Sequence, residues 1–156
     1  MARITLVRHG QASFGAANYD KLSPHGRAQA TELGKWWQHC GRDFDVAWAG
    51  DMERQKDTGA LALAERSAAT PSISIDTAFN EYSTETLIQA YTNVIHEKVP
   101  ELRNSADMSN PGVFFRTLNT MHECWSSHAE PTNDAPGFEP WKQFRDRIMA
   151  GLARVA

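Results

Sequence analysis

The sequence has little cysteine, little net charge and no long apolar run, and each shortage excludes a class of protein. Its two cysteines, Cys40 and Cys124, are too few for a disulfide framework and form no paired-cysteine metal motif. The formal net charge is -3, whereas a general nucleic-acid-binding domain usually carries a basic face. The apolar run near the N-terminus is too short for a signal peptide or a membrane span. These absences predict a cytoplasmic protein that binds neither nucleic acid nor membrane.

The remaining composition is that of an ordinary globular protein. Of the 156 residues, 41% are hydrophobic and 22% are charged, which is enough apolar material for one core. A chain of this length holds one domain rather than two. The sequence contains no internal repeat, low-complexity tract or interdomain linker. We therefore predict a single domain over residues 1–156.

Short β-prone runs and helical segments alternate in the first half of the chain. Residues 4–7, 46–49 and 72–75 are the β-prone runs. Ser23 and Pro24 start a helix, as N-cap and first helical residue, and Gly41 closes it. A second helix is expected from about Met52 to Arg66, with Asp51 as its N-cap. This alternation predicts an α/β fold with parallel strands.

The second half breaks this alternation. Over residues 83–135, one helix is expected around Leu87, Tyr91 and Val94, and another from Phe114 to Trp125. We interpret this stretch as a helical insertion beside the sheet. A final helix carries an apolar stripe formed by Trp141, Phe144, Ile148, Leu152 and Val155. The stripe predicts that this helix covers an apolar surface.

Charged side chains follow each predicted strand at the edge where an α/β sheet binds its ligands. Arg8 and His9 come directly after the first strand, and Arg54 lies in the first turn of the helix after the second. Glu81 follows the third strand by a few residues. A guanidinium presents a planar set of donors that matches phosphate oxygens. This combination suits the binding of a phosphate monoester.

Four ordered segments resemble the histidine phosphatase superfamily, the phosphoglycerate-mutase-like enzymes. LVRHGQASF at 6–14 is similar to the strand–turn signature, and DKLSPHGRAQA at 20–30 to the entry of the first helix. DMERQKDTG at 51–59 is similar to the segment with the second phosphate-binding arginine, and AFNEY at 78–82 to the region of the acid/base carboxylate. The resemblance implies a three-layer sandwich, with a mostly parallel central sheet flanked by helices and a helical insertion.

The resemblance also implies the roles of individual residues. His9 would be the nucleophile that is transiently phosphorylated, and Glu81 the acid and base. Arg8 and Arg54 would bind the phosphate oxygens. Such an enzyme requires no cofactor and no metal.

Four further histidine and polar positions are weaker candidates for a site. Gln11 and Ser13 follow the Arg-His-Gly motif and could line its pocket, although polar loop residues usually only contact water. His122 and His128 are six positions apart, which is about 240° around a helix, so they do not form a metal pair.

The substrate and the type of reaction stay open at this point. The resemblance implies a phosphatase acting on a phosphorylated small molecule or a phosphoprotein. One alternative is a phosphoglycerate mutase, and another is a catalytically impaired domain that binds a phospho-ligand or a protein. Many mutases of the family have asparagine where this chain has Gly15, and Gly50-Asp51 replaces the usual Ser-Pro. Because of both differences, the substrate of any one family member cannot be assigned to this chain.

The resemblance finally implies a second histidine, on a strand that follows the last helix. The sequence has no such strand, and its other histidines lie in or beside helical segments: His25, His39, His96, His122 and His128. We therefore expect the domain to be incomplete at its C-terminus and residues 1–156 to be almost inactive. A longer chain, or a second copy in a homodimer, would supply the strand.

Overall fold

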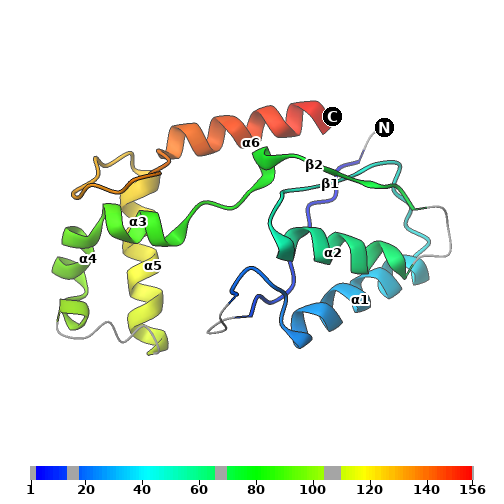
Figure 1. The fold of residues 1–156 in the computed structure, drawn as a ribbon, viewed down its shortest axis with the longest axis horizontal. Helices are drawn as coiled ribbons and strands as arrows, with labels where there is room; N and C mark the ends of the chain where they lie inside the picture. The colour runs from blue at the N-terminus through cyan, green and yellow to red at the C-terminus, as the bar shows by residue number, and fades with distance from the viewer. Residues whose placement is uncertain (1–2, 14–17, 66–69, 104–109, 156) are drawn as a thin grey trace. The chain divides into compact units, whose positions relative to one another are not determined.

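The computed structural model describes residues 3–13, 18–65, 70–103 and 110–155. These residues divide into two compact units (Figure 1). The first unit comprises residues 1–81 and 148–156, and the second comprises residues 82–147. The expected insertion at 83–135 falls within the second unit, while the single domain over the whole chain stays a prediction.

The first unit contains two short parallel strands. Strand β1 (Ala47–Ala49) pairs with β2 (Ile73–Ile75), with Ala47 opposite Ile73. Two of the predicted β runs are thus confirmed as parallel neighbours, and the chain is α/β. The three-layer sandwich needs more strands than the two in the described part of the chain, so it stays a prediction.

The strand expected at residues 4–7 is wrong. This segment forms no strand, and Ile4, Leu6 and Val7 are 48%, 79% and 44% exposed. A β-prone sequence becomes a strand only where a neighbour offers backbone partners. Within the described residues no strand pairs with this segment.

Helix α1 (Pro24–His39) begins and ends as the sequence predicts. The Ser23 hydroxyl accepts a hydrogen bond from the Gly26 N–H at 3.0 Å, and Pro24 is the first helical residue. Gly41 follows the helix with φ of +59°, the left-handed conformation that glycine adopts without strain.

Helix α2 (Glu53–Ala64) forms where expected, but the predicted cap is wrong. Met52 occupies the N-cap position and makes no capping bond with its side chain. The Asp51 carboxylate instead accepts a hydrogen bond from the Asn80 amide at 2.7 Å. A carboxylate distant in the sequence caps α2, because Asp20 Oδ2 accepts from the Glu53 N–H at 2.8 Å.

Helices α1 and α2 lie side by side in the first unit (Figure 1). Their backbones approach closely at Gly34, where an added Cβ would stand 2.2 Å from the Ala62 carbonyl oxygen. The end of α6 (Trp141–Val155) contacts the 3-10 helix η1 (Thr77–Phe79) through Gly151. Arg154 also forms an ion pair with Asp76. These contacts join the end of α6 to the segment that follows β2.

The second unit is helical and has its own core. It contains α3 (Thr84–Ala90), α4 (Thr92–Lys98), the 3-10 helix η2 (Pro100–Arg103), α5 (Pro111–Ser126) and the start of α6. Its most buried large side chains are Leu87, Tyr91, Ile95, Met121 and Trp125.

The helices expected in this second unit are confirmed, with one correction. A single helix through 87–94 is wrong, because the backbone at Tyr91 leaves the helical conformation with φ of -108°. The Tyr91 hydroxyl donates to the Ala129 carbonyl at 2.9 Å, which holds the ring inside the core.

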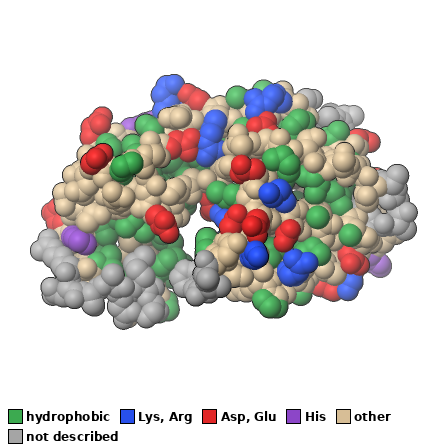
Figure 2. Space-filling model, viewed as in Figure 1, with side chains coloured by type: hydrophobic (Ala, Val, Ile, Leu, Met, Phe, Trp, Pro, Cys, Tyr) green, Lys and Arg blue, Asp and Glu red, His purple; other side chains and the backbone are tan. Residues whose placement is uncertain are grey.

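The surface carries charges of both signs. Figure 2 shows Lys and Arg side chains mixed with Asp and Glu side chains on this face of the molecule. None of the helices in the described part of the chain is long and apolar enough to cross a bilayer.

Candidate active site

His9 is held in one orientation at the turn after residues 4–7. Its Nδ1 lies 2.7 Å from the Gly10 carbonyl oxygen, and its Nε2 lies 3.3 Å from Arg54 Nε. A carbonyl oxygen only accepts and a guanidinium only donates, so the proton is on Nδ1 and the lone pair is on Nε2. The histidine therefore presents an unprotonated nitrogen toward Arg54.

Arg54 is the centre of the cluster. Its side chain is 7% exposed and contacts a different partner through each nitrogen. Nε donates to His9, Nη1 donates to Asp20 at 2.7 Å, and Nη2 donates to Glu81 at 2.6 Å. Burial opposes its charge, but the ion pairs with Glu81 and Asp20 raise the pKa of Arg54. The arginine is a fixed cation at the base of the site.

Glu81 is ionised in this arrangement. Its Oε2 lies 3.7 Å from His9 Nε2, which is beyond hydrogen-bond distance. The same oxygen lies 2.6 Å from Arg54 Nη2. The His9 ring in its protonated form first, and the Arg54 guanidinium next, hold the pKa of Glu81 at about 2, although burial acts in the opposite direction. With a lone pair on Nε2, the neutral ring leaves this effect to Arg54 alone. The side chain is 39% exposed, so it can move without disturbing the core.

The turn that carries His9 is fixed by two backbone contacts. The Gly10 N–H donates to Thr58 Oγ1 at 3.0 Å, and that hydroxyl donates to the Arg54 carbonyl at 2.7 Å. On the other side, an added Cβ on Gly10 would stand 2.4 Å from the Gly26 carbonyl oxygen. The motif turn thus fits between the start of α1 and the body of α2.

The structure brings His9, Arg54 and Glu81 together, whereas the other predicted site residues lie apart from this cluster. Arg8 is exposed and makes no ion pair with any described residue. Gln11 bonds to α1, because its side-chain oxygen accepts from the Ser23 hydroxyl at 2.9 Å. Ser13 is half-buried, and its N–H donates to the Lys21 carbonyl at 2.8 Å. The proposed roles of these residues stay predictions.

Sequence reasoning missed Asp20 and Thr58. Asp20 lies in the segment similar to the entry of the first helix, but no periodicity marks it as a partner of Arg54. Thr58 is four residues after Arg54, on the same face of α2, and is 5% exposed. The signal available in the sequence was a hydroxyl residue one helical turn after a candidate arginine.

Across the described ranges, no group of three or more His, Cys, Asp or Glu side chains is placed to hold a metal ion. The groups that the described cluster offers are an imidazole, a guanidinium and carboxylates.

Comparison with known proteins identifies the family. The model of the histidine phosphatase superfamily, branch 1, matches residues 4–126. The chain belongs to the histidine phosphatase superfamily. The four motif segments quoted above all lie inside the matched range. Members of this superfamily are generally phosphatases or mutases.

One curated relative of the chain is a 2,3-bisphosphoglycerate-dependent phosphoglycerate mutase from Methylorubrum populi. The two are 28% identical over 120 residues, which cover 70% of this chain and 57% of the mutase. The matched part therefore spans little more than half the length of that relative. No solved structure matches the chain.

Proposed function

We propose that the protein hydrolyses a phosphate monoester, on a small molecule or a phosphoprotein, through a phosphohistidine intermediate at His9. The observation that carries this proposal is the position of His9 Nε2, 3.3 Å from the Nε of a buried guanidinium, which donates to it. A nucleophilic nitrogen beside a fixed cation is what attack on a phosphoryl group requires. The full three-layer sandwich and a cytoplasmic location belong to the same proposal.

Substrate binding would rearrange the cluster. In the free site, Glu81 occupies Nη2 of Arg54, which is the position that a phosphate oxygen would take. A dianionic phosphate group interacts with a guanidinium more strongly than a single carboxylate charge does. We infer that the phosphate displaces Glu81, while Arg8 supplies a second cation from the motif turn.

The displaced Glu81 would gain the properties of a general acid. It loses the contacts with His9 and with the Arg54 guanidinium that hold its pKa near 2 and faces a phosphate anion instead, so its pKa rises. As His9 Nε2 forms the N–P bond, the P–O bond breaks and the Glu81 proton passes to the leaving oxygen. Glu81 then accepts a proton from water, which attacks phosphorus and releases inorganic phosphate and free His9.

The second histidine implied by the family is not part of this cluster. Among the described residues, no histidine other than His9 contacts Arg54 or Glu81. One preorganised donor to the phosphoryl oxygens contributes about 3 kcal/mol, roughly a hundredfold in rate. We infer slow turnover for residues 1–156 alone, and faster turnover when another chain segment or a second protomer brings a histidine to Arg54.

A phosphoglycerate mutase is the second candidate, because the curated relative is named as one. A mutase would retain the phosphohistidine and return its phosphoryl group to a second substrate. Gly15, which differs from the asparagine of many mutases, lies outside the described residues. A domain that binds phosphate but forms no phosphohistidine is the remaining alternative.

The test is the formation and fate of the phosphoenzyme. We expect acid-labile radioactive phosphate on the purified protein after incubation with a labelled phosphate monoester, and none on His9→Ala. Decay of the label to inorganic phosphate indicates a phosphatase, and transfer to added phosphoglycerate indicates a mutase. Phosphate binding with no label on wild-type protein would refute both enzymes in favour of the binding domain.

Glu81→Gln separates binding from chemistry. The variant removes the proton donor, so turnover of an ester with a poor leaving group should fall roughly 10²- to 10⁴-fold. It also removes the anion that competes for Arg54, so phosphate should bind at least as tightly as in wild type. Normal turnover in Glu81→Gln, measured by phosphate release, would move the acid role to another carboxylate.

A further inference from the structure

Thr58 lies on α2 one turn after Arg54, and its hydroxyl joins two backbone segments of the candidate site. The hydroxyl donates to the Arg54 carbonyl at 2.7 Å and accepts from the Gly10 N–H at 3.0 Å. A threonine hydroxyl has one proton, and the Arg54 carbonyl receives it. The lone pairs of Thr58 are therefore directed to the turn that carries His9. The residue is 5% exposed, so water does not compete for these bonds.

Four hydrogen bonds form a closed ring through this hydroxyl. Besides the two bonds of Thr58, His9 Nδ1 donates to the Gly10 carbonyl at 2.7 Å, and Arg54 Nε donates to His9 Nε2 at 3.3 Å. In an imidazole, the partner of one nitrogen determines which nitrogen carries the proton. Both partners of the His9 ring belong to residues that Thr58 holds by their backbones.

A bond from a threonine hydroxyl to the carbonyl four residues earlier is common in helices and is by itself no sign of a special role. Thr117 on α5 makes such a bond, to the Val113 carbonyl at 2.9 Å, and is fully buried. Thr58 differs because it also accepts from Gly10, which is 48 positions away in the sequence. This long-range bond is the feature that connects α2 to the nucleophile candidate.

We propose that Thr58 is a positioning residue for His9, which fixes the orientation and the tautomer of the ring through Gly10. The consequence for catalysis rests on the proposed function. Without the hydroxyl, the buried Gly10 N–H has no acceptor, so the turn moves to find one. The Gly10 carbonyl moves with it, and His9 Nδ1 loses the acceptor that holds its proton. Nε2 is then displaced from Arg54 and is unprotonated for only part of the time.

Two substitutions at Thr58 separate the hydroxyl from the shape of the side chain. Thr58→Val keeps the branched shape without the hydroxyl, and Thr58→Ser keeps the hydroxyl. Nitrogen NMR of the His9 ring, at a pH where the ring is neutral and with His9→Ala for assignment, reports the tautomer directly. We expect protonated Nδ1 and unprotonated Nε2 in wild type and in Thr58→Ser. In Thr58→Val the two signals should shift toward each other, as in a mixture of tautomers.

The rate of phosphohistidine formation gives the catalytic consequence. At saturating substrate we expect it to fall roughly 100-fold in Thr58→Val, because a small displacement of a reacting atom has an effect of this size. Thr58→Ser should restore most of the rate. If wild-type protein forms no phosphohistidine, the proposed function is refuted, whereas the ring signals, which need no substrate, still decide the role of Thr58.

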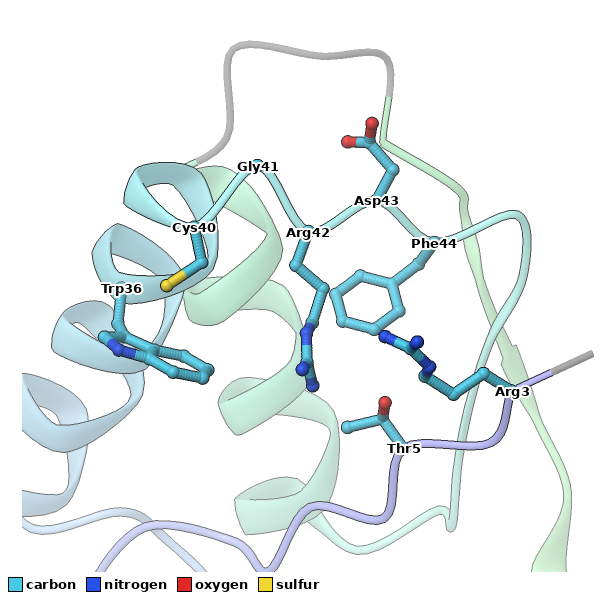
Figure 3. A pocket seen from close by; sticks show the side chains of 8 residues that line it. All are labelled: Arg3, Thr5, Trp36, Cys40, Gly41, Arg42, Asp43 and Phe44. Carbon is cyan, nitrogen blue, oxygen red and sulfur yellow. The ribbon is translucent and has the colours of Figure 1, made fainter.

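Two further valine variants are matched controls. Thr117→Val removes a buried hydroxyl with the same helical bond from the second unit. Thr5→Val removes a hydroxyl from the first unit. Thr5 is four positions before His9 but lines a pocket of about 340 Å³ together with residues 40–44 (Figure 3), and no residue of the His9 cluster lines that pocket. Both controls should show the ring signals of wild type.

Three results would overturn the proposal: wild-type ring signals in Thr58→Val, mixed signals in Thr58→Ser, or an equal change of the signals in either control. Should Thr58→Val not fold, hydrogen exchange of the wild-type Gly10 amide gives the answer. A protected Gly10 amide in both wild type and Thr58→Ser would support the proposal, because its bond to the hydroxyl shields it from water. Exchange at the rate of an exposed loop amide would contradict it.

Discussion

At the scale of single residues, Arg54 decides how the candidate site works. One guanidinium holds the nucleophile candidate through Nε and two carboxylates through its other nitrogens. In the free state its charge is therefore balanced by Asp20 and Glu81. A phosphate that binds at Arg54 must compete with these partners, so its affinity depends on the free energy needed to displace each carboxylate.

The depressed pKa of Glu81 predicts a specific dependence of stability on pH. Its folded pKa is about 2 and its ordinary value is 4.5, so the ionised group stabilises the fold above pH 4.5. That contribution is lost as the pH falls from about 4.5 to about 2. We expect the difference in Tm between wild type and Glu81→Gln to shrink over this range, with a modest amplitude because the side chain is partly exposed. A constant difference in thermal melts across this range would contradict the assigned ion pair.

Asp20→Asn should strengthen phosphate binding. The change removes one negative charge from Arg54 but keeps an oxygen that can accept from the Glu53 N–H, so α2 stays capped. Removing a partly exposed charge of this kind is worth about 1 kcal/mol, roughly fivefold in Kd. Isothermal titration with inorganic phosphate measures the effect. Asp57→Asn, at an exposed ion pair with Arg27, is the control and should leave the Kd unchanged. Weaker binding to Asp20→Asn would show that Asp20 orients Arg54 rather than competing for it.

The sequence allowed three members of this cluster to be predicted, because each follows a β-prone run or begins the next helix. His9, Arg54 and Glu81 were placed by that rule, and the structure brings them together. Asp20 could not be predicted in the same way. Its contact with Arg54 depends on the path of a loop between distant segments, and no periodicity encodes such a path.

At the scale of elements, local signals predicted helices better than strands. Ser23 and Pro24 fix the start of α1 through their own hydrogen bonds and backbone angles, so sequence alone suffices. The segment at 4–7 has the composition of a strand but forms none. Strand formation depends on a neighbouring backbone, which no local pattern specifies. The predicted N-cap of α2 was wrong for a related reason, because the Asp51 carboxylate accepts a hydrogen bond from the distant Asn80 amide instead.

Gly26→Ala tests whether close backbone contact positions the motif turn. An added Cβ on Gly26 would stand 2.1 Å from the Gln11 carbonyl oxygen, and backbone cannot yield as a side chain can. We expect the variant to lose about 1–3 kcal/mol of unfolding free energy in denaturant titration, and to bind phosphate more weakly because the turn shifts.

Gly112→Ala is the matched control for this variant. Gly112 also lies in the first turn of a helix after proline, but its added Cβ would meet only the Asn110 side chain at 3.3 Å. Its effect on stability should be small, and phosphate binding should not change. Equal loss in both variants would indicate that alanine disturbs helix starts in general, without any special role for the motif turn.

At the scale of the whole molecule, the residues of the candidate site all belong to one unit. His9, Asp20, Arg54, Thr58 and Glu81 lie within residues 1–81, whereas the largest buried side chains belong to the unit of residues 82–147. The candidate site and the main apolar core therefore belong to different parts of the chain. The family match does not follow this division, because residues 4–126 extend across both units.

Met121→Ala in the second core tests this separation. Met121 is fully buried, so its truncation should destabilise the second unit by about 2–5 kcal/mol and lower its unfolding transition in calorimetry. Above that transition, and while the first unit stays folded, the Kd for phosphate should equal the wild-type value, since every residue of the candidate site belongs to the first unit.

Phe115→Ala on the same helix is the control, because Phe115 is 61% exposed and should change stability by no more than about 0.5 kcal/mol. The decisive comparison is between binding and stability in Met121→Ala at a temperature above the transition of the second unit and below that of the first. If phosphate affinity falls there while hydrogen exchange shows that α1 and α2 remain folded, the second unit must help to form the site. If affinity holds, residues outside 82–147 are sufficient to bind phosphate.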